Sequence, residues 1–266
     1  MPLRVYTYRS RRFPAGNFGD VISPWLIERV FDIPARAADV GDCDLVAAGS
    51  VLDLVMSRRW RRWLHGKFEL PYLWGTGTAR PGPLIQYPRQ RLLALRGPST
   101  AQRCGCAEGE LPLGDPVWLL AELQLATPTT RKINVIPHIS HAQDREMRNL
   151  AIRLGAGLID LGADIDSVCA SIKASTLVIS SSLHGLLGAL ALGIPAIWCT
   201  PDSGRGLHPW KFSDALGAVD TKMVCHRPET LATLSMDALY DLATQVSTAR
   251  IAERCDALRS AFSPVL

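Results

Sequence analysis

Short apolar runs rich in β-branched residues alternate with longer segments of helical periodicity, and this alternation limits the possible folds most strongly. It is typical of βα units, which assemble into parallel sheets. The runs with the length and composition of buried strands are 3–8, 43–49, 70–75, 92–97, 133–138, 157–161, 176–181 and 196–200. Helical patterns cover 20–31, 99–104, 116–125, 142–154, 164–174, 183–192 and 236–262. The sequence therefore predicts an α/β protein with parallel sheets.

The segment "LATPTTRK" at 125–132 interrupts this alternation. It is short and polar and contains Pro128, which is typical of a linker, and a clean strand pattern begins directly after it. We therefore expect two Rossmann-like domains of similar size, 1–126 and 131–266, that face each other across a cleft. The last helix could pack back on the first domain.

The composition is that of an ordinary globular protein, with 47% hydrophobic and 20% charged residues. No uninterrupted apolar stretch is long enough to span a bilayer, and the opening "MPLRVYTYRSRR" lacks the apolar core of a signal peptide. A cytoplasmic location is expected.

Seven cysteines without an export signal predict reduced, mostly buried thiols. Cys104 and Cys106 form a C-x-C pair, but no second pair stands at the spacing of a zinc site. His138 and His141 form an H-x-x-H pair that also lacks a third ligand nearby in the sequence. We expect neither a metal ion nor a cofactor.

The stretch "SSSLHGLLGALALGIP" at 180–195 joins the end of an apolar strand to a helix of small residues. Its serines are suited to cap the helix, and Gly193 and Pro195 end it. His184 falls in the first turn, where a helix attracts anions, so its imidazole could give a proton to a bound ligand. The same histidine could instead be structural and bond to a neighbouring carbonyl.

This stretch resembles the signature helix of the polysaccharide pyruvyl transferases, which reads S-x-R-L-H before a small-residue helix and G-x-P. Other motifs of that family are matched in order by "GNFGD" at 16–20, "LRGPST" at 95–100, "GDP" at 114–116 and "KFSD" at 211–214. The matches span about three quarters of the chain, from 16 to 214. The S-L-H-G form is most similar to the exopolysaccharide ketal pyruvyltransferases of the xanthan type.

The resemblance implies a GT-B-like fold and transfer of a pyruvyl group from phosphoenolpyruvate to two hydroxyls of a sugar. The acceptor would be a lipid-linked exopolysaccharide repeat unit, and the product a pyruvate ketal. The first domain would then hold the acceptor and face the membrane, and the second would hold the donor. Many family members have an arginine where this chain has Ser182, so another cation must hold the donor here, and Lys211 is a candidate.

The chemistry of an enol phosphate calls for cations and helix amides around its two anionic groups. Arg96 is the first choice for this clamp, although it could be a surface arginine paired with a loop acid. The residues expected to bind the donor are Arg96, Ser99, Ser182, Leu183, His184, Gly185 and Lys211.

Proton transfer calls for a positioned acid and a positioned base. His184 is the preferred general acid and His138 the second candidate. Asp20 could be the base that activates the acceptor hydroxyl, or it could be the N-cap of the helix that follows it. The acceptor is expected to lie at Asn17, Asp20, Gly49 and Ser50.

The segment "SRRWRRWLHGK" at 57–67 combines tryptophans at helical spacing with a run of cations. This combination suits an anionic membrane surface, although an ordinary helix could also pack its tryptophans on the core. The expected membrane-surface residues are Arg58, Arg59, Trp60, Arg61, Arg62, Trp63 and Lys67. They predict a peripheral contact with the inner face of the cytoplasmic membrane. Nucleic acid is not an expected partner, because the rest of the chain is not basic.

Two other functions are open at this point. A GT-B glycosyltransferase would use a nucleotide sugar and would need an acidic residue for the ribose, yet Glu146 and Glu229 read as acids on helix surfaces. A non-catalytic scaffold of polysaccharide assembly would explain Ser182, but the presence of Arg96, His138 and His184 argues against it.

Overall fold

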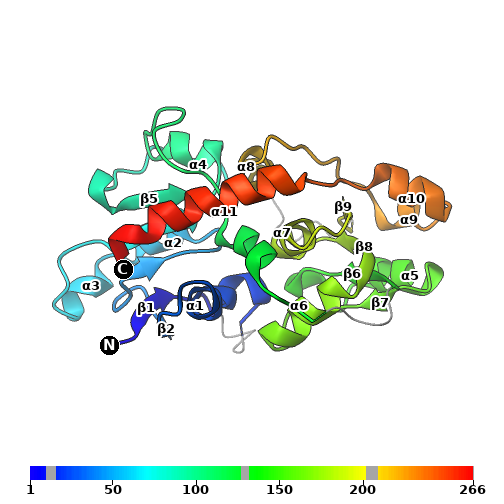
Figure 1. Ribbon diagram of the computed structural model, residues 1–266, viewed down its shortest axis with the longest axis horizontal. Coiled ribbons are helices and arrows are strands. Elements are labelled where there is room, and N and C mark those ends of the chain that lie inside the picture. Colours follow the sequence, from blue (N-terminus) through cyan, green and yellow to red (C-terminus); the bar gives the residue numbers. More distant parts are fainter. Residues whose placement is uncertain (10–15, 127–131, 202–208, 266) are drawn as a thin grey trace. The chain divides into compact units, whose positions relative to one another are not determined.

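The computed structural model describes residues 1–9, 16–126, 132–201 and 209–265 (Figure 1). The chain divides into two compact units. Unit 1 takes the described residues of Met1–Glu122, His208–Lys222 and Ala249–Leu266, and unit 2 those of Leu123–Leu207 and Met223–Thr248. Each unit contains one sheet, and all strand pairs in both sheets are parallel.

The sheet of unit 1 has the strand order β2-β1-β3-β4-β5. Its strands are β1 (Leu3–Tyr6), β2 (Ala35–Ala38), β3 (Leu45–Val46), β4 (Tyr72–Thr76) and β5 (Leu92–Leu95). Its helices are α1 (Phe18–Phe31), α2 (Leu52–Ser57), α3 (Arg61–Leu64), α4 (Pro98–Arg103), α8 (Trp210–Gly217) and α11 (Thr248–Phe262), with 3₁₀ turns η1 (Arg89–Arg91), η2 (Pro116–Glu122) and η4 (Ser263–Val265).

The sheet of unit 2 has the order β7-β6-β8-β9. Its strands are β6 (Lys132–Ile136), β7 (Gly157–Leu158), β8 (Ser175–Ser180) and β9 (Ala196–Trp198). Its helices are α5 (Arg145–Arg153), α6 (Ile165–Lys173), α7 (Leu183–Ala191), α9 (Pro228–Leu231) and α10 (Met236–Leu242), with the 3₁₀ turn η3 (Ile139–His141). The α/β class with two Rossmann-like parallel sheets is confirmed.

Local sequence explains where the helices of unit 2 begin. The carboxylate of Asp144 accepts hydrogen bonds from the amides of Glu146 and Met147 at the start of α5. Asp164 caps α6 in the same way through the amide of Ser167. Behind these caps, apolar side chains of the strands and helices form the core, as in the buried cluster that includes Val135, Ile179 and Leu150. A satisfied N-cap contributes about 1 kcal/mol to a helix.

The sequence assigned 131–266 to the second domain and left open that its last helix packs back on the first. In the structure α11 does belong to unit 1, and so does α8, which was not predicted. Non-local contacts explain this placement: α8 packs beside α4 (Figure 1). The indole of Trp74 donates to the carbonyl of Leu258 in α11 at 2.9 Å. Phe262 stacks on Phe31 with ring centroids 4.3 Å apart. Residues 127–131 of the predicted linker lie outside the described residues.

Two further elements differ from the sequence prediction. The expected helix at 236–262 is two helices, α10 and α11, because Thr244 between them pairs with Ala196 through two backbone hydrogen bonds of 2.9 and 3.0 Å. The edge strand β2 was not predicted, since its sequence "ARAA" has little apolar or β-branched character.

Among the described residues, the helices are all too short or too polar to cross a bilayer.

Candidate active site

Both sheets place their predicted site residues where the strand order reverses. In unit 1 the chain runs from β1 outward to β2 and then returns to the other side of β1 with β3. Unit 2 repeats this pattern with β6, β7 and β8. The crevice beyond the carboxyl ends of the two strands at such a reversal is where doubly wound sheets bind ligands. Asn17 and Ser50 follow β1 and β3, and His138 and His184 follow β6 and β8.

Arg96 lies directly after β5 and is completely buried. Its guanidinium donates to Oδ2 of Asp214 through Nε at 3.0 Å and Nη2 at 2.9 Å. Nη2 also donates to the carbonyl of Thr78 at 2.7 Å, and Nη1 to the hydroxyl of Ser50 at 2.5 Å. A buried guanidinium needs partners of this kind because an unpaired buried charge is very costly.

Asp214 is also completely buried and is satisfied from α4 as well. The amide of Thr100 donates to Oδ1 at 2.9 Å, and its hydroxyl donates to Oδ2 at 2.7 Å. The pair therefore joins α8 to the carboxyl ends of β4 and β5. The role of Arg96 as a donor clamp stays a prediction; in the structure its partner is this carboxylate.

Two glycines make room for the pair. A Cβ on Gly77 would lie 2.3 Å from Cζ of Arg96, and one on Gly97 would lie 1.7 Å from the carbonyl oxygen of Asp214. Neither distance is compatible with a side chain, so these positions require glycine.

Asn17 and Asp20 lie at the start of α1, whose N-cap is Asn17. Asp20 is inside the first turn. The alternative that Asp20 is the N-cap of this helix is therefore wrong. The side-chain amide of Asn17 donates to Oδ2 of Asp20 at 3.5 Å, and Oδ1 of Asn17 is buried without a hydrogen-bond donor among the described residues. A Cβ on Gly49 would lie 3.7 Å from Oδ1 of Asp20, so this carboxylate adjoins the loop after β3.

Lys211, in the first turn of α8, is partly buried. Burial and the positive charge of Arg96 lower the pKa of Lys211 from 10.5 to about 8, although Asp20 acts in the opposite direction. Among the described residues the ammonium forms no hydrogen bond or ion pair. Lys211 and Asp20 thus bring opposite charges to the same edge of the sheet as Arg96.

We expect Lys211→Met to stabilise the protein at pH 7. The pKa of Lys211 falls from 10.5 in the unfolded chain to about 8 in the fold. Below pH 8 the folded state therefore carries the full cost of this charge, about 3 kcal/mol. Between pH 8 and 10.5 the unfolded chain binds more protons, so the stability of the unmodified protein rises with pH.

Urea unfolding at pH 7 and pH 10 checks this prediction. The gain from Lys211→Met should be largest at pH 7 and nearly absent at pH 10. Lys222→Met, at an exposed position of unit 1, is the matched control and should change little at either pH. A gain that does not depend on pH, or no gain, would contradict the assignment.

In unit 2 the turn from β8 to α7 is built by three buried serines. The hydroxyl of Ser180 donates to the carbonyl of Ile136 at 2.8 Å and accepts from the amide of Ser182 at 2.9 Å. The hydroxyl of Ser182 caps α7 by accepting from the amide of Gly185 at 3.5 Å. Position 182 thus has a structural use here, where many family members have an arginine.

His184 is in the first turn of α7 and is 6% exposed. Gly185 lets this turn approach the sheet, because a Cβ there would lie 2.6 Å from the hydroxyl of Ser180 and 3.0 Å from Ile136. Gly185 therefore lets the turn that carries His184 lie close to the ends of β6 and β8. Leu183 is buried in the same turn.

His138 follows β6 and lies next to this turn. Its amide donates to the hydroxyl of Ser181 at 2.8 Å, and that hydroxyl is 3.1 Å from Nδ1 of His141. The amide of Ser140 donates to Nδ1 of His138 at 3.2 Å, so the proton of the neutral imidazole is on Nε2. The rings of His138 and His141 have centroids 5.8 Å apart. Ser181 therefore joins the two loops that carry the histidines.

The predicted membrane segment folds differently from a single amphipathic helix. It forms α2 and α3 with a turn at 58–60 between them. Arg62 is buried at 5% exposure and donates to the carbonyls of Val40, Cys43 and Glu69. Lys67 is paired with Asp42 and Asp44. Arg62 and Lys67 are therefore not membrane-surface residues, because they bind acceptors of the protein itself.

The tryptophans of that segment do face solvent. Trp60, Trp63, Leu64 and Phe68 are 55%, 69%, 74% and 83% exposed, and we call them the apolar patch. Arg59 is exposed beside them and donates to the carbonyl of Met56. The alternative of a tryptophan face packed on the core is wrong.

Sequence reasoning missed Thr78, Thr100 and Trp210, which complete the surroundings of Arg96. The amide of Thr78 donates to the hydroxyl of Thr100 at 3.2 Å, and the indole of Trp210 donates to the hydroxyl of Thr78 at 3.0 Å. The "KFSD" motif held the one available signal, since a buried arginine needs a carboxylate and Asp214 ends that motif. Ser99, expected to bind the donor, is partly exposed in the first turn of α4.

All seven cysteines are free thiols, and six of them are buried. Within the described residues no group of three or more His, Cys, Asp or Glu side chains is arranged to hold a metal ion.

The chain is similar to a known polysaccharide biosynthesis protein and, more distantly, to a solved structure. The chain is 27% identical over 216 residues to the succinoglycan biosynthesis protein ExoV of Rhizobium meliloti (strain 1021). The aligned part is 80% of this chain and 63% of that protein. A crystal structure of a candidate UDP-N-acetylglucosamine 2-epimerase from Listeria monocytogenes covers 99% of this chain and 97% of its own, with 12% identity and a TM-score of 0.40. That structural similarity is too low to carry an argument.

The family comparison is more specific. The model of the polysaccharide pyruvyl transferase family matches residues 5–203, which run from within β1 past the end of β9 and include the turn that carries His184. The match confirms the resemblance that the sequence motifs indicated. The chain belongs to the polysaccharide pyruvyl transferase family.

Proposed function

We propose that this protein transfers the pyruvyl group of phosphoenolpyruvate to two hydroxyls of one sugar in a lipid-linked exopolysaccharide unit, forming a pyruvate ketal. The observation that supports this most is the family match over residues 5–203, which includes the histidine held at the start of α7. The similarity to a succinoglycan biosynthesis protein supports an exopolysaccharide acceptor.

The donor carries a phosphate and a carboxylate, so its site needs positive charge. Lys211 and Arg96 supply cations in unit 1, and the start of α7 supplies a helix N-terminus in unit 2. In our proposal Lys211 replaces, for the donor, the arginine that is absent at Ser182. Ser99, Leu183 and Gly185 line the donor in this scheme.

The reaction begins when His184 gives a proton to the terminal methylene of the donor, which becomes a methyl group. The carbon bearing the phosphate is then electrophilic, and a sugar hydroxyl adds to it while Asp20 accepts the hydroxyl proton. The C–O bond to phosphate breaks next, and the departing phosphate takes the proton that Asp20 accepted. A second hydroxyl of the same sugar adds to that carbon and closes the ketal, and its proton returns to the imidazole. The products are the ketal and inorganic phosphate.

The acceptor in this scheme lies against Asn17, Asp20, Gly49 and Ser50, at the strand reversal of unit 1. The buried Oδ1 of Asn17, which accepts no hydrogen bond from a described residue, is suited to a sugar hydroxyl. His138 is the second candidate for the general acid. The reaction requires no metal ion or further cofactor.

The apolar patch and Arg59 would hold the protein peripherally on the inner face of the cytoplasmic membrane, where a lipid-linked acceptor is made available. Exposed tryptophans beside a cation are typical of such contacts. Sedimentation with vesicles containing phosphatidylglycerol tests this part of the proposal.

Incubating the purified protein with phosphoenolpyruvate and a set of mannosyl and galactosyl acceptors tests the reaction. We expect phosphate release to equal the gain of one pyruvyl group per acceptor, measured by a phosphate assay and mass spectrometry. Transfer from a nucleotide sugar would support a glycosyltransferase instead. The absence of both reactions with every acceptor would support a scaffold and contradict the proposal.

A further inference from the structure

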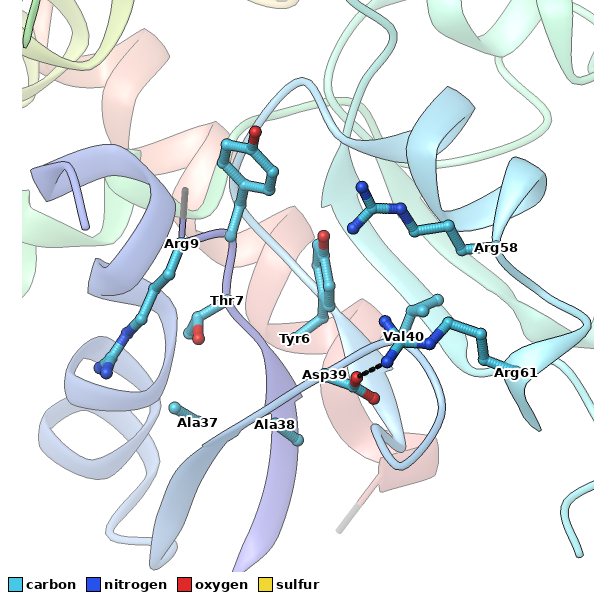
Figure 2. Close-up of a pocket in the computed structure, with 10 residues that line it drawn as sticks. Tyr6, Thr7, Arg9, Ala37, Ala38, Asp39, Val40, Arg58 and Arg61 are labelled. Atoms are coloured by element: carbon cyan, nitrogen blue, oxygen red, sulfur yellow. Dashed lines mark ion pairs between the residues drawn. The ribbon is translucent and has the colours of Figure 1, made fainter. Parts of the chain in front are cut away.

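A cavity of about 360 Å³ opens at the carboxyl ends of β1 and β2, apart from the residues assigned above to the donor and acceptor sugar (Figure 2). Tyr6 ends β1 and Ala38 ends β2, and both line the cavity. Arg58, at the end of α2, and Arg61, at the start of α3, form one wall, and Arg9 contributes from the other side. In Figure 2 the Arg58 guanidinium extends toward Tyr6.

The cavity carries an excess of positive charge. Three guanidinium groups line it, and the carboxylate of Asp39 is the acidic lining group. Asp39 pairs with Arg61 at 3.1 Å, and the other two guanidinium groups form no ion pair with a described residue. The side chain of Arg58 makes no hydrogen bond or ion pair with a described residue. An arrangement of this kind favours an anion that guanidinium groups can bind through two oxygens.

The hydroxyl of Tyr6 is a second group that the cavity offers to a ligand. Tyr6 is 5% exposed, yet its hydroxyl forms no hydrogen bond within the described part of the chain, and the residue lines the cavity. Burial raises the pKa of Tyr6 to about 12, so the group remains a hydrogen-bond donor at neutral pH. The hydroxyl is thus available to donate a hydrogen bond to a ligand in the cavity that Tyr6 lines.

The surroundings of the cavity indicate what that ligand is attached to. A Cβ on Gly16 would lie 3.8 Å from Cγ of Arg9, which lines the cavity. Asn17 follows Gly16 directly, so the cavity adjoins the proposed acceptor site. On the other side, α3 carries Arg61 into the cavity and Trp63 and Leu64 into the apolar patch. A ligand here would have a sugar on one side and a lipid on the other.

We propose that this arginine cavity binds the diphosphate that joins the acceptor sugar to its lipid. This inference rests on the proposed function for the identity of the acceptor. Arg58 and Arg61 bind the diphosphate oxygens, Tyr6 donates a hydrogen bond to them, and the sugar then extends toward Asp20. The lipid follows the apolar patch. Arg58 and Arg61 thus act on the acceptor rather than as part of a general membrane surface.

A binding measurement tests the site without requiring transfer. The probe is farnesyl diphosphate in solution, with phosphoenolpyruvate present in excess to saturate the donor site, and binding is followed by calorimetry. We expect the double variant Arg58→Gln, Arg61→Gln to weaken binding on the order of 100-fold, because two charge-assisted contacts are lost. Farnesol, which lacks phosphate, should bind neither protein measurably.

Arg36→Gln is the matched control, because Arg36 is an exposed arginine of the same unit that makes one ion pair outside the cavity. It should bind the probe as the unmodified protein does. Thermal unfolding of all variants shows whether they are folded. Equal binding of farnesyl diphosphate by the double variant and the control would overturn the proposal. The proposal would also be overturned if the double variant bound farnesyl diphosphate normally but no longer bound phosphatidylglycerol vesicles. That result would show that the two arginines bind a lipid headgroup.

A kinetic arm separates this inference from the proposed function. We expect KM for a diphosphate-linked acceptor to be much higher in the double variant than in the unmodified protein. KM for the methyl glycoside of the same sugar should be the same in both proteins. If farnesyl diphosphate binding depends on the arginines but no acceptor is pyruvylated, the proposed reaction fails and the cavity assignment stands. If transfer occurs and both acceptors respond alike to the double variant, the cavity assignment fails and the reaction stands.

Discussion

Asp214→Asn is expected to lower the free energy of unfolding by about 3–5 kcal/mol, the range typical of a buried ion pair that loses one partner. The carboxylate accepts four hydrogen bonds, two from Arg96 and two from Thr100, and neither Asp214 nor Arg96 is exposed to solvent. Asparagine keeps the shape of the side chain but removes its charge. The guanidinium of Arg96 is then buried without a counter-charge. In addition, the NH₂ group of asparagine faces hydrogen-bond donors and cannot accept from them.

Urea unfolding of four proteins measures this effect: the unmodified protein, Asp214→Asn, Arg96→Met, and the double variant Arg96→Met, Asp214→Leu. The double variant removes both charges, so it should recover much of the stability that either single change loses. Asp220→Asn is the control, because Asp220 pairs with Arg250 at 3.0 Å with side chains 82% and 47% exposed. Exposed pairs contribute under about 1 kcal/mol. A comparable loss in Asp220→Asn and Asp214→Asn would contradict the argument.

The Arg96–Asp214 pair also shows what the sequence could not predict. The two residues are 118 positions apart, and no local pattern links them. The sequence placed α8 in the second domain because it follows the strands of that domain. The buried ion pair between Asp214 on α8 and Arg96 at the end of β5 explains why this helix belongs to unit 1. Lys211 is part of α8 and therefore lies in the same unit as Asp20, whose charge acts on it.

Elements with a strong local signal were predicted well. β8 is an apolar strand that ends in serines, and its turn into α7 begins where the capping serine and small residues indicated. The position of His184 at the start of that helix follows from the same signal. Likewise, Arg96 was predicted after β5, and Asn17 and Asp20 after β1. Arg96, Asn17 and Asp20 lie at one edge of the sheet of unit 1, because the carboxyl ends of its parallel strands share that edge.

The arginine-tryptophan segment marks the limit of such reasoning. Its spacing fits a helix, but spacing does not say which cations face the protein. Arg62 is buried because the carbonyls of Val40, Cys43 and Glu69 converge on it from parts of the chain that are distant in sequence. Arg58 and Arg61, next to it, line a cavity instead. Three neighbouring arginines therefore have different surroundings that only the fold distinguishes.

Replacing His184 by glutamine is expected to lower kcat of pyruvyl transfer by about 10²–10⁴-fold, the usual contribution of a positioned general acid. Glutamine keeps a hydrogen-bonding group of similar size at this 6% exposed position but cannot give up a proton in the reaction. The affinity for phosphoenolpyruvate should change little, because the cations and helix amides that bind the donor remain. Steady-state kinetics and calorimetry of donor binding measure the two quantities separately.

His65→Gln is the matched control, since His65 is an exposed histidine of unit 1 that has no role in the proposed reaction. It should retain full activity. His138→Gln tests the second candidate: if His138 were the acid, the loss in kcat would follow that substitution instead. Because the acid delivers its proton to the donor methylene, the reaction in D₂O should place one deuterium in the methyl group of the ketal. A His184→Gln variant that weakens donor binding but keeps kcat and deuterium incorporation would show that the imidazole binds phosphate and does not transfer the proton.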